Sequence, residues 1–490
     1  MAASPQPFLN LVGGRRVPAT SGATLDSLDP ATGTTWATIP RGGAADIDEA
    51  VAAATNASDG WWALPALQRA AHLRAIAETM ARHSRELAEV ESRDNGRPLA
   101  ETIAGDLPAS VQMFHFHAGA ADKIHGDTVN VAPTSFNFTR REPIGVIGII
   151  IPWNSPLSLV SAKAGAALAA GNTVVVKPAE QASCSVLRWA SLLEEAGLPP
   201  GVVNVVAGLG EEAGDALVCH RDVPRVTFTG ATGTGRVITE RAAGTLTQLH
   251  LELGGKSPNI VFADADLDAA AVGTSTAAVF TGGAGQSCVA GSRVLIQSSV
   301  FDEMIERITK EAASVRLGGP LDEDTTMGPI VSAEQFERVR AYLELGRQEG
   351  KLVFGGGSGA ELFSAGSPYA GGYFVEPTLF LVDGNDHRIC REEIFGPVAV
   401  AMPFETDEEA VALANDSSYG LAAGVWTSDL KRAHRMVRDL RAGSVWVNAY
   451  RRIHWALPFG GVKDSGYGRD SGIESVLENT QLKTAWIDLT

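Results

Sequence analysis

Residues 144–151, with the sequence IGVIGIII, decide the fold of this chain of 490 residues. The run is apolar at successive positions, which is typical of a strand that a parallel sheet buries on both faces. A helical pattern of small residues follows at 157–170, and a second β-branched run follows at 173–177. A strand, a helix and a strand in this order predict a βαβ unit.

The same alternation continues to residue 253 and resumes after residue 258. It predicts an α/β chain with two parallel sheets, each covered by helices on both faces. Further strands are expected at 202–206, 225–229, 246–253, 258–262, 293–296, 398–403, 424–427 and 444–448. The expected helices span 183–195, 211–219 and 233–243, and longer ones begin at Asp266, Phe301 and Glu334.

Three segments lie outside this alternation. Residues 44–92 are rich in alanine and predict two or three helices. Residues 123–142 alternate polar and apolar side chains and predict an exposed antiparallel hairpin, and residues 480–489 predict a strand. Partly apolar strands outside both sheets are edges that need partners. We therefore expect the chain to self-associate.

The composition excludes several classes of protein. The net charge is −17, from 57 acidic and 40 basic residues, and no block of Lys or Arg is present. This balance argues against a nucleic acid or an anionic membrane as a partner. The longest apolar runs have about eight residues, whereas a membrane span needs about 20.

The cysteines and the N-terminus point to a reducing compartment. Cys184, Cys219, Cys288 and Cys390 are scattered and form no CxxC pair, which argues against a disulfide framework and a zinc site. Residues 1–11 lack a basic segment followed by an apolar core, so they do not form a secretory signal. We expect a cytoplasmic protein without a bound metal.

Two residues supply the equipment for a covalent reaction at a carbonyl. Cys288 lies in GQSCVAGSR at 285–293, and Glu252 lies in LELGGKSP at 251–258. They offer a nucleophile and a base that activates it or its water. An inert buried thiol is the commoner role for an intracellular cysteine, and Glu252 also fits a strand-end carboxylate in water. The glycines around Cys288 favour a bare turn over core packing.

Two further stretches fit a nucleotide. TGATGTG at 229–235 follows a strand and opens a helix, where backbone N–H groups can hold a pyrophosphate. KPAE at 177–180 ends a neighbouring strand, where a lysine and a carboxylate can bind ribose hydroxyls. A carboxylate there repels a 2′-phosphate and favours NAD over NADP. A tight structural turn and a solvated charge pair remain the alternatives.

Three motifs are weaker when taken singly. Asn154 in PWNSP at 152–156 offers an amide donor to an oxyanion, or else forms an Asx turn that caps the next helix. EEIFGP at 392–397 supplies a carboxylate and an aromatic ring, and PFGGVKDSG at 458–466 supplies a glycine-rich turn. Taken singly, the last two are explained better by plain loops.

Together, these stretches resemble the aldehyde dehydrogenase superfamily in their order and approximate spacing, over essentially the whole chain. The resemblance implies two Rossmann-like parallel-sheet domains and a small antiparallel oligomerisation element. It assigns 1–122 and 143–253 to NAD binding, 254–456 to catalysis, and 123–142 with 480–490 to oligomerisation. Residues 457–479 then return across the active site. The expected assembly is a dimer or a tetramer.

The resemblance also implies catalytic roles. Cys288 corresponds to the nucleophile that forms a thiohemiacetal, and Asn154 with the Cys288 N–H corresponds to the oxyanion hole. Glu252 would activate the water that hydrolyses the thioester, which favours a free acid over an acyl coenzyme A. Lys163 and Asp470 take the positions of a proton relay. The relay carboxylate is usually Glu, and Asp470 is one methylene shorter.

The cofactor expected from the resemblance is NAD. Its contacts would include the adenosine ribose, the pyrophosphate and the nicotinamide ribose. Ala231 departs from the serine that the family often has in the phosphate turn, which removes one hydroxyl donor. The expected cofactor-binding residues are Ile151, Pro152, Trp153, Lys177, Glu180, Gly210, Gly230, Gly235, Leu253, Glu393 and Phe395.

The substrate tunnel is expected to be wide. Positions 155, 162 and 282 often carry aromatic residues in members that take small aldehydes, and here all three are small. We therefore expect a bulky aldehyde, aromatic or cyclic. Arg451 or Arg452 could meet a substrate carboxylate, or both could be solvated. The expected tunnel residues are Ser155, Ala162, Gly282, Ser287, Val289, His454, Trp455 and Phe459.

Two other functions compete with an aldehyde dehydrogenase that yields a free acid. One is a semialdehyde dehydrogenase that acylates coenzyme A, against which Glu252 argues. The other is a scaffold or binding protein without catalysis, against which the intact set of Cys288, Glu252 and Asn154 argues.

Overall fold

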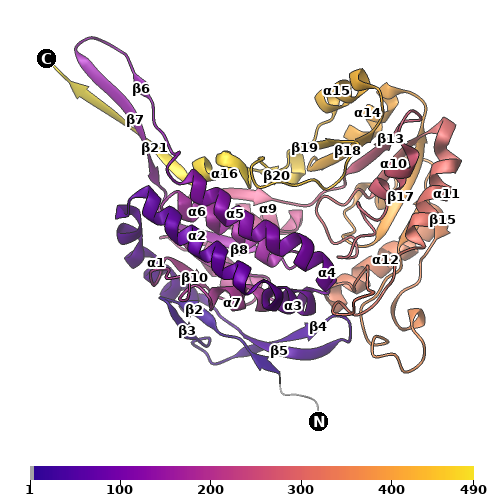
Figure 1. Cartoon of the computed structure of the whole chain (residues 1–490), viewed down its shortest axis with the longest axis horizontal. Helices are drawn as coiled ribbons and strands as arrows, with labels where there is room; N and C mark the ends of the chain where they lie inside the picture. The colour runs from indigo at the N-terminus through magenta and orange to yellow at the C-terminus, as the bar shows by residue number, and fades with distance from the viewer. Residues whose placement is uncertain (1–4) are drawn as a thin grey trace.

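The computed structural model describes residues 5–490 and contains two helix-covered β-sheets, a projecting three-stranded arm and a small three-stranded sheet near the N-terminus. In Figure 1 the first sheet lies in the indigo-to-magenta half and the second in the orange half, with the yellow C-terminal segment crossing between them. The predicted α/β architecture is therefore confirmed. The first four residues of the predicted domain 1–122 lie outside the described residues.

The first sheet has eight strands in the order β20-β12-β11-β8-β9-β10-β2-β3. Its five central strands are parallel, and the strands at its two ends run antiparallel to their neighbours. Every residue of the strand that opens the βαβ alternation is buried, as its apolar sequence predicts. The strands are β2 Asn10–Val12, β3 Arg15–Val17, β8 Val146–Ile151, β9 Thr173–Pro178, β10 Val203–Val205, β11 Arg225–Thr229, β12 Gln248–Glu252 and β20 Gly466–Tyr467.

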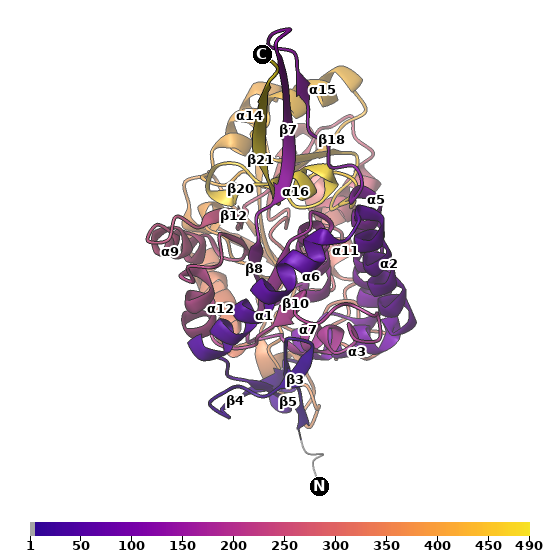
Figure 2. The same cartoon turned by 90° about the vertical axis from the view of Figure 1, so that its left-hand side faces the viewer.

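Helices cover both faces of the first sheet (Figures 1 and 2). Two of them are shorter than predicted. The helix expected at 183–195 ends at Ala190, because Leu192 and Leu193 donate to carbonyls three residues back and tighten the chain into turns. The helix expected at 211–219 is a π-turn, η2 Gly210–Gly214, followed by one short helix. The helices are α1 Ala44–Ala63, α2 Ala66–Arg82, α3 Ser84–Asn95, α4 Leu99–Glu101, α5 Leu107–Ala120, α6 Pro156–Ala169, α7 Cys184–Ala190, α8 Asp215–Val218 and α9 Thr232–Ala242, with the π-turn η1 Thr102–Asp106.

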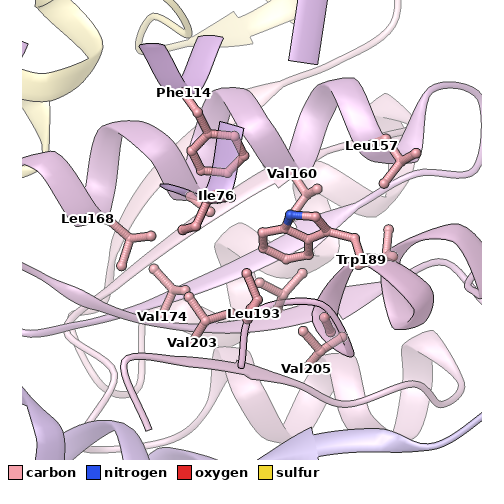
Figure 3. Packing of buried hydrophobic residues seen from close by; sticks show 14 of the residues in the cluster. Ile76, Phe114, Leu157, Val160, Leu168, Val174, Trp189, Leu193, Val203 and Val205 are labelled. Atoms are coloured by element: carbon pink, nitrogen blue, oxygen red, sulfur yellow. The ribbon is translucent and has the colours of Figure 1, made fainter. Parts of the chain in front are cut away.

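The largest core cluster packs α5, α6 and α7 onto the first sheet (Figure 3). Phe114 of α5 and Trp189 of α7 are fully buried, and their rings stack with centroids 6.1 Å apart. Val174 and Val203 of the sheet lie beneath them in Figure 3. This packing fixes α6, whose first residue follows the site loop at 152–155.

The second sheet has seven strands in the order β15-β16-β17-β14-β13-β18-β19. Six are parallel, and only the edge strand β15 runs antiparallel. The strands are β13 Pro258–Val261, β14 Arg293–Gln297, β15 Lys351–Phe354, β16 Thr378–Leu381, β17 Val398–Phe404, β18 Ala422–Trp426 and β19 Ser444–Val447. The helices are α10 Leu267–Thr274, α11 Phe301–Ala312, α12 Ala333–Glu349, α13 Arg388–Arg391, α14 Asp407–Asn415 and α15 Leu430–Asp439, with the short turns η3 Ser298–Val300, η4 Gly359–Leu362 and η5 Lys463–Ser465.

The arm combines the predicted hairpin with the C-terminal strand. It consists of β6 Thr128–Val129, β7 Ser135–Pro143 and β21 Thr480–Asp488, in the order β21-β7-β6. It projects from the body of the molecule (Figures 1 and 2). Phe136, Leu482 and Trp486 are exposed on it, with Trp486 at 62%. A further helix, α16 Gly472–Glu478, precedes β21, and a small sheet of β1 Gln6–Pro7, β4 Thr24–Asp29 and β5 Thr34–Pro40 lies near the N-terminus.

The structure also bears on the membrane spans, metal sites and disulfides considered from the sequence. Among residues 5–490, no helix is long and apolar enough to cross a membrane. The same residues contain no group of three His, Cys, Asp or Glu side chains that could hold a metal ion. All four cysteines are free thiols.

Candidate active site

A cavity of about 650 Å³ lies between loops of the two sheets. Residues after β8, β11 and β12 line it from the first sheet. The loop before β14 and the loop before β17 line it from the second sheet. Ligands of open α/β sheets bind beyond the carboxyl ends of strands, so this is the expected place for a site.

Cys288 lies half-buried in the loop before β14 and faces this cavity. The loop holds a tight turn in which Gly285 has φ of +68°. A Cβ at Gly285 would overlap the Gly396 carbonyl, so glycine is required there. Burial, followed by the charges of Glu393 and Glu252, raises the pKa of the Cys288 thiol to about 12. The thiol therefore rests protonated and needs a base.

Asn154 follows β8 and faces the same loop. Its Nδ2 donates to the Gln286 carbonyl at 3.1 Å, and its Oδ1 is buried without a hydrogen-bond partner. Arg97 donates to the Asn154 carbonyl at 3.3 Å and to Ser155 Oγ at 2.6 Å, which fixes the turn. The alternative of an Asx cap is wrong, because the N-cap of α6 is Ser155 and the Leu157 N–H in its first turn donates to Glu91 Oε2 at 3.1 Å.

Glu252 ends β12 and is only 3% exposed. Its Oε2 is buried without a hydrogen-bond partner, and its Oε1 lies 3.4 Å from His250 Nε2. Burial, followed by the nearby charge of Asp470, raises its pKa well above the ordinary value. The alternative of a strand-end carboxylate in water is therefore wrong. A buried carboxyl of raised pKa is suited to proton transfer near neutrality.

Lys163 and Asp470 form a buried ion pair behind Glu252. Lys163 Nζ lies 2.8 Å from Asp470 Oδ2 and 3.0 Å from Thr227 Oγ1. Burial acts to raise the Asp470 pKa, but the charges of Lys163 and His250 and the hydrogen bond from Lys163 together outweigh it, so the net pKa is lowered. The shorter aspartate still reaches Lys163, because backbone bonds between Asp470 and Phe459 hold it close.

Polar groups suited to a dinucleotide line one side of the cavity or lie beside it. Lys177 Nζ pairs with Glu180 Oε2 at 2.8 Å, and Glu393 Oε1 accepts the Gly255 N–H at 2.9 Å. Burial raises the Glu393 pKa to about 7. Thr229 Oγ1 is buried without a partner at the cavity wall. An orphaned hydroxyl and a carboxylate beside an open cavity fit the hydroxyls and phosphates of NAD.

Phe395 is held in an unusual conformation beside the same wall. Its φ is +60°, and its ring meets Trp153 edge-on at 5.2 Å. Gly235 was expected to contact the phosphates, but it also has a packing role. A Cβ there would lie 2.7 Å from Leu253, so the glycine lets α9 pack against the end of β12.

The cavity brings together most of the predicted site residues. Those that line it are Pro152, Trp153, Asn154, Ser155, Ala162, Gly230, Glu252, Leu253, Ser287, Cys288, Val289, Glu393, Phe395, Trp455, Phe459 and Asp470. Within the described residues, those that do not line it are Ile151, Lys163, Lys177, Glu180, Gly210, Gly235, Gly282 and His454.

Gly282 requires a correction. Its α-carbon faces Glu101 and Pro98, and a Cβ there would overlap Glu101 Oε2. The small residue at 282 therefore makes room for Glu101 and does not widen the cavity. His454 is exposed and stacks on Trp455 with ring centroids 4.1 Å apart, so only Trp455 faces inward.

Several lining residues carried no sequence motif. Arg97, Asp106, Ala109 and Met113 come from α5 and the turns before it, far from any predicted site residue in sequence. Arg451 also lines the cavity and lies 3.5 Å from Glu101, whereas Arg452 is exposed. Arg451 has φ of +54°. Arg451 is one of the two arginines expected near a substrate carboxylate, whereas no sequence pattern marks Arg97, Asp106, Ala109 or Met113, because the fold alone places them.

Comparisons with known proteins agree with this geometry. The profile of the aldehyde dehydrogenase family matches residues 17–485. The Bacillus subtilis (strain 168) protein DhaS is 45% identical over 480 residues, covering 98% of this chain and 95% of DhaS. An aldehyde dehydrogenase of Alternaria alternata is 43% identical over 487 residues, covering 99% of this chain and 96% of its own. The Bacillus cereus aldehyde dehydrogenase solved with NAD⁺ superposes with a TM-score of 0.95 at 41% identity, covering 99% of this chain and 97% of that one.

Proposed function

This chain belongs to the aldehyde dehydrogenase family, and on that premise we propose that it oxidises an aldehyde to a carboxylic acid with NAD. One observation carries the proposal: Cys288, Asn154 and Glu252 meet at a single cavity with a nucleotide-compatible wall. The roles below follow from the chemistry of these side chains.

Cys288 is the nucleophile. Because its pKa is about 12, a base must take its proton as the sulfur attacks the aldehyde carbon. Glu252 is the base that faces the same cavity with an unpaired oxygen. An amide NH₂ has two donor hydrogens, and Asn154 uses only one on Gln286. The other is free to stabilise the oxyanion of the thiohemiacetal, together with the Cys288 N–H.

NAD would bind along the side of the cavity that carries Thr229, Gly230 and Glu393. Lys177 and Glu180 would bind the adenosine ribose, Gly230 would lie by the phosphates, and Glu393 would bind the second ribose. When bound along this side of the cavity, NAD would supply the acceptor for the hydride of the carbon attached to Cys288. The Glu180 carboxylate disfavours a 2′-phosphate at the adenosine end, so NAD is preferred over NADP.

Glu252 acts a second time once the proton that it took from Cys288 has left it for solvent. It takes a proton from the water whose oxygen bonds to the thioester carbon, the carbon–sulfur bond breaks, and the Cys288 sulfur regains a proton from the new carboxylic acid, which leaves as the carboxylate. This step directs the acyl group to water in place of coenzyme A. The small side chains of Ser155 and Ala162 at the cavity wall support a bulky aldehyde as substrate. Exposed apolar residues on the arm support self-association through it.

NADH formation tests the proposal. Purified protein is mixed with a panel of aldehydes from acetaldehyde to benzaldehyde-sized compounds, with NAD or NADP and without coenzyme A. We expect turnover with NAD in the absence of coenzyme A, and higher kcat/KM for the larger aldehydes. The Cys288→Ala variant should lose turnover and still bind NAD. Turnover that survives in this variant, or that requires coenzyme A, would contradict the proposal.

A further inference from the structure

His250 links the buried base to the protein surface. It lies two residues before Glu252 on β12, so both side chains point to the same face of the strand. Its Nε2 is 3.4 Å from Glu252 Oε1. The His250 side chain is only 4% exposed. The imidazole is therefore in hydrogen-bond contact with the carboxyl that activates water.

The other ring nitrogen faces the outside. His250 Nδ1 is 4.0 Å from Glu478 Oε2 at the end of α16. The Glu478 side chain is 33% exposed, and it also pairs with Arg225 at 3.3 Å. One bridging water or a small rotation of the Glu478 side chain closes the gap of 4.0 Å. A line of three side chains thus runs from the sealed Glu252 to solvent.

We propose that His250 carries the proton that Glu252 takes from the attacking water out to Glu478 and solvent. The idea rests on the proposed role of Glu252. The Glu252 O–H donates to His250 Nε2 as the His250 Nδ1–H passes to Glu478, so the imidazole gains one proton and loses one. Glu478 then releases its proton to water.

The surroundings suit an uncharged imidazole. Burial, and then the positive charge of Lys163, lowers the His250 pKa to about 3. A neutral imidazole accepts at one nitrogen and donates at the other, which a relay requires. Gly468 leaves the ring its room, because a Cβ there would overlap His250 Cδ2. The charged groups that face the ring are Glu252, Glu478, Asp470, Lys163, Arg225 and Arg469.

The Lys163–Asp470 pair is the competing route. Asp470 Oδ1 lies 3.9 Å from the same His250 Nε2. However, the side chains of Lys163 and Asp470 are only 1% and 9% exposed, and Asp470 faces the same cavity as Glu252, so this pair offers no separate path to the surface. Glu478, at 33%, is the most exposed acidic group in contact with His250. The geometry therefore favours the path through Glu478.

The experiment separates acyl transfer to Cys288 from hydrolysis. A rapid burst of NADH reports the first step, and kcat reports the second when hydrolysis limits turnover. His250→Gln should keep the burst amplitude and the KM for aldehyde and NAD within about twofold, while kcat falls about tenfold or more. Added imidazole should restore kcat in His250→Ala. A purely structural role would not produce this rescue.

Glu478 supplies a second variant that does not depend on a core substitution. Glu478→Gln should lower kcat and keep the burst, as His250→Gln does. Arg225→Met is the matched control: it breaks the Arg225–Glu478 pair but keeps the carboxylate, so kcat should stay within about twofold of the parent.

The outcomes are distinguishable. A parent burst with kcat unchanged in His250→Gln and Glu478→Gln would overturn the relay and leave the proposed function intact. If His250→Gln does not fold, unchanged kcat in Glu478→Gln alone overturns the relay. The absence of NADH formation by the parent protein with every aldehyde of the panel would instead overturn the proposed function.

Discussion

Replacing Glu252 by glutamine tests the pairing of nucleophile and base. The amide keeps the shape of the side chain but cannot take a proton. The Cys288 pKa of about 12 then governs the reaction, because only the thiolate attacks. At about pH 8 the thiolate fraction is about one in ten thousand, and it rises about tenfold for each pH unit. Loss of the negative charge at 252 lowers the Cys288 pKa somewhat and softens this penalty.

The assay is the rate of the NADH burst in a stopped-flow instrument, measured from about pH 7 to about pH 10. In Glu252→Gln, the burst rate constant at about pH 8 should fall by about 10²–10⁴-fold and should climb steeply with pH. In the parent, the rate should rise only through the raised pKa of Glu252 and then level off. Glu240→Gln on the exposed face of α9 is the matched control. A Glu252→Gln burst that equals the parent at every pH would refute the assignment of the base.

Three other predictions address the site wall, the core and the arm. Gly282→Ala should lower kcat/KM by about tenfold to a hundredfold with little change in unfolding temperature. The added Cβ displaces Glu101, and the Glu101 carboxylate holds Arg97 against the turn at Asn154. An unchanged kcat/KM would contradict this link. Trp189→Ala should lower the free energy of unfolding in urea by about 3–5 kcal/mol, since the ring is fully buried against Phe114; a loss below about 1 kcal/mol would contradict the packing. Trp486→Lys should shift the protein toward monomer in sedimentation. Val237→Lys, at an exposed apolar residue of α9, should not. Identical sedimentation of both variants would argue against the arm as the interface.

The fold was largely predictable because parallel strands leave a strong trace in sequence. A strand buried on both faces, such as β8, must be apolar at successive positions, and the helices between such strands must be amphipathic. Helix ends were less predictable. The end of α7 at Ala190 depends on three-residue turns that the apolar pattern of 191–195 does not reveal.

Some residues of the candidate site were predictable from the sequence and others were not. Cys288, Glu252 and Asn154 each carry a local motif, so the sequence indicated them. Gly282 did not behave as its small size suggested, because its neighbour Glu101 comes from a distant turn. Only the fold reveals that contact.

His250 is an intermediate case. The alternation of side chains along a strand places it on the same face as Glu252, and this was visible in the sequence. Its second partner, Glu478, lies on α16 and was not visible, because the return of the C-terminal segment to the edge of the first sheet brings the two together.

The most direct measurement of the covalent mechanism is the mass of the protein after a single turnover. Glu252→Gln is mixed with NAD and an aldehyde that the parent oxidises, incubated at about pH 9 to allow acylation, then quenched in acid and digested. The account predicts an acyl group on the peptide that contains Cys288, in an amount equal to the NADH formed. NADH without an acyl group on Cys288, or an acyl group on another cysteine, would contradict it.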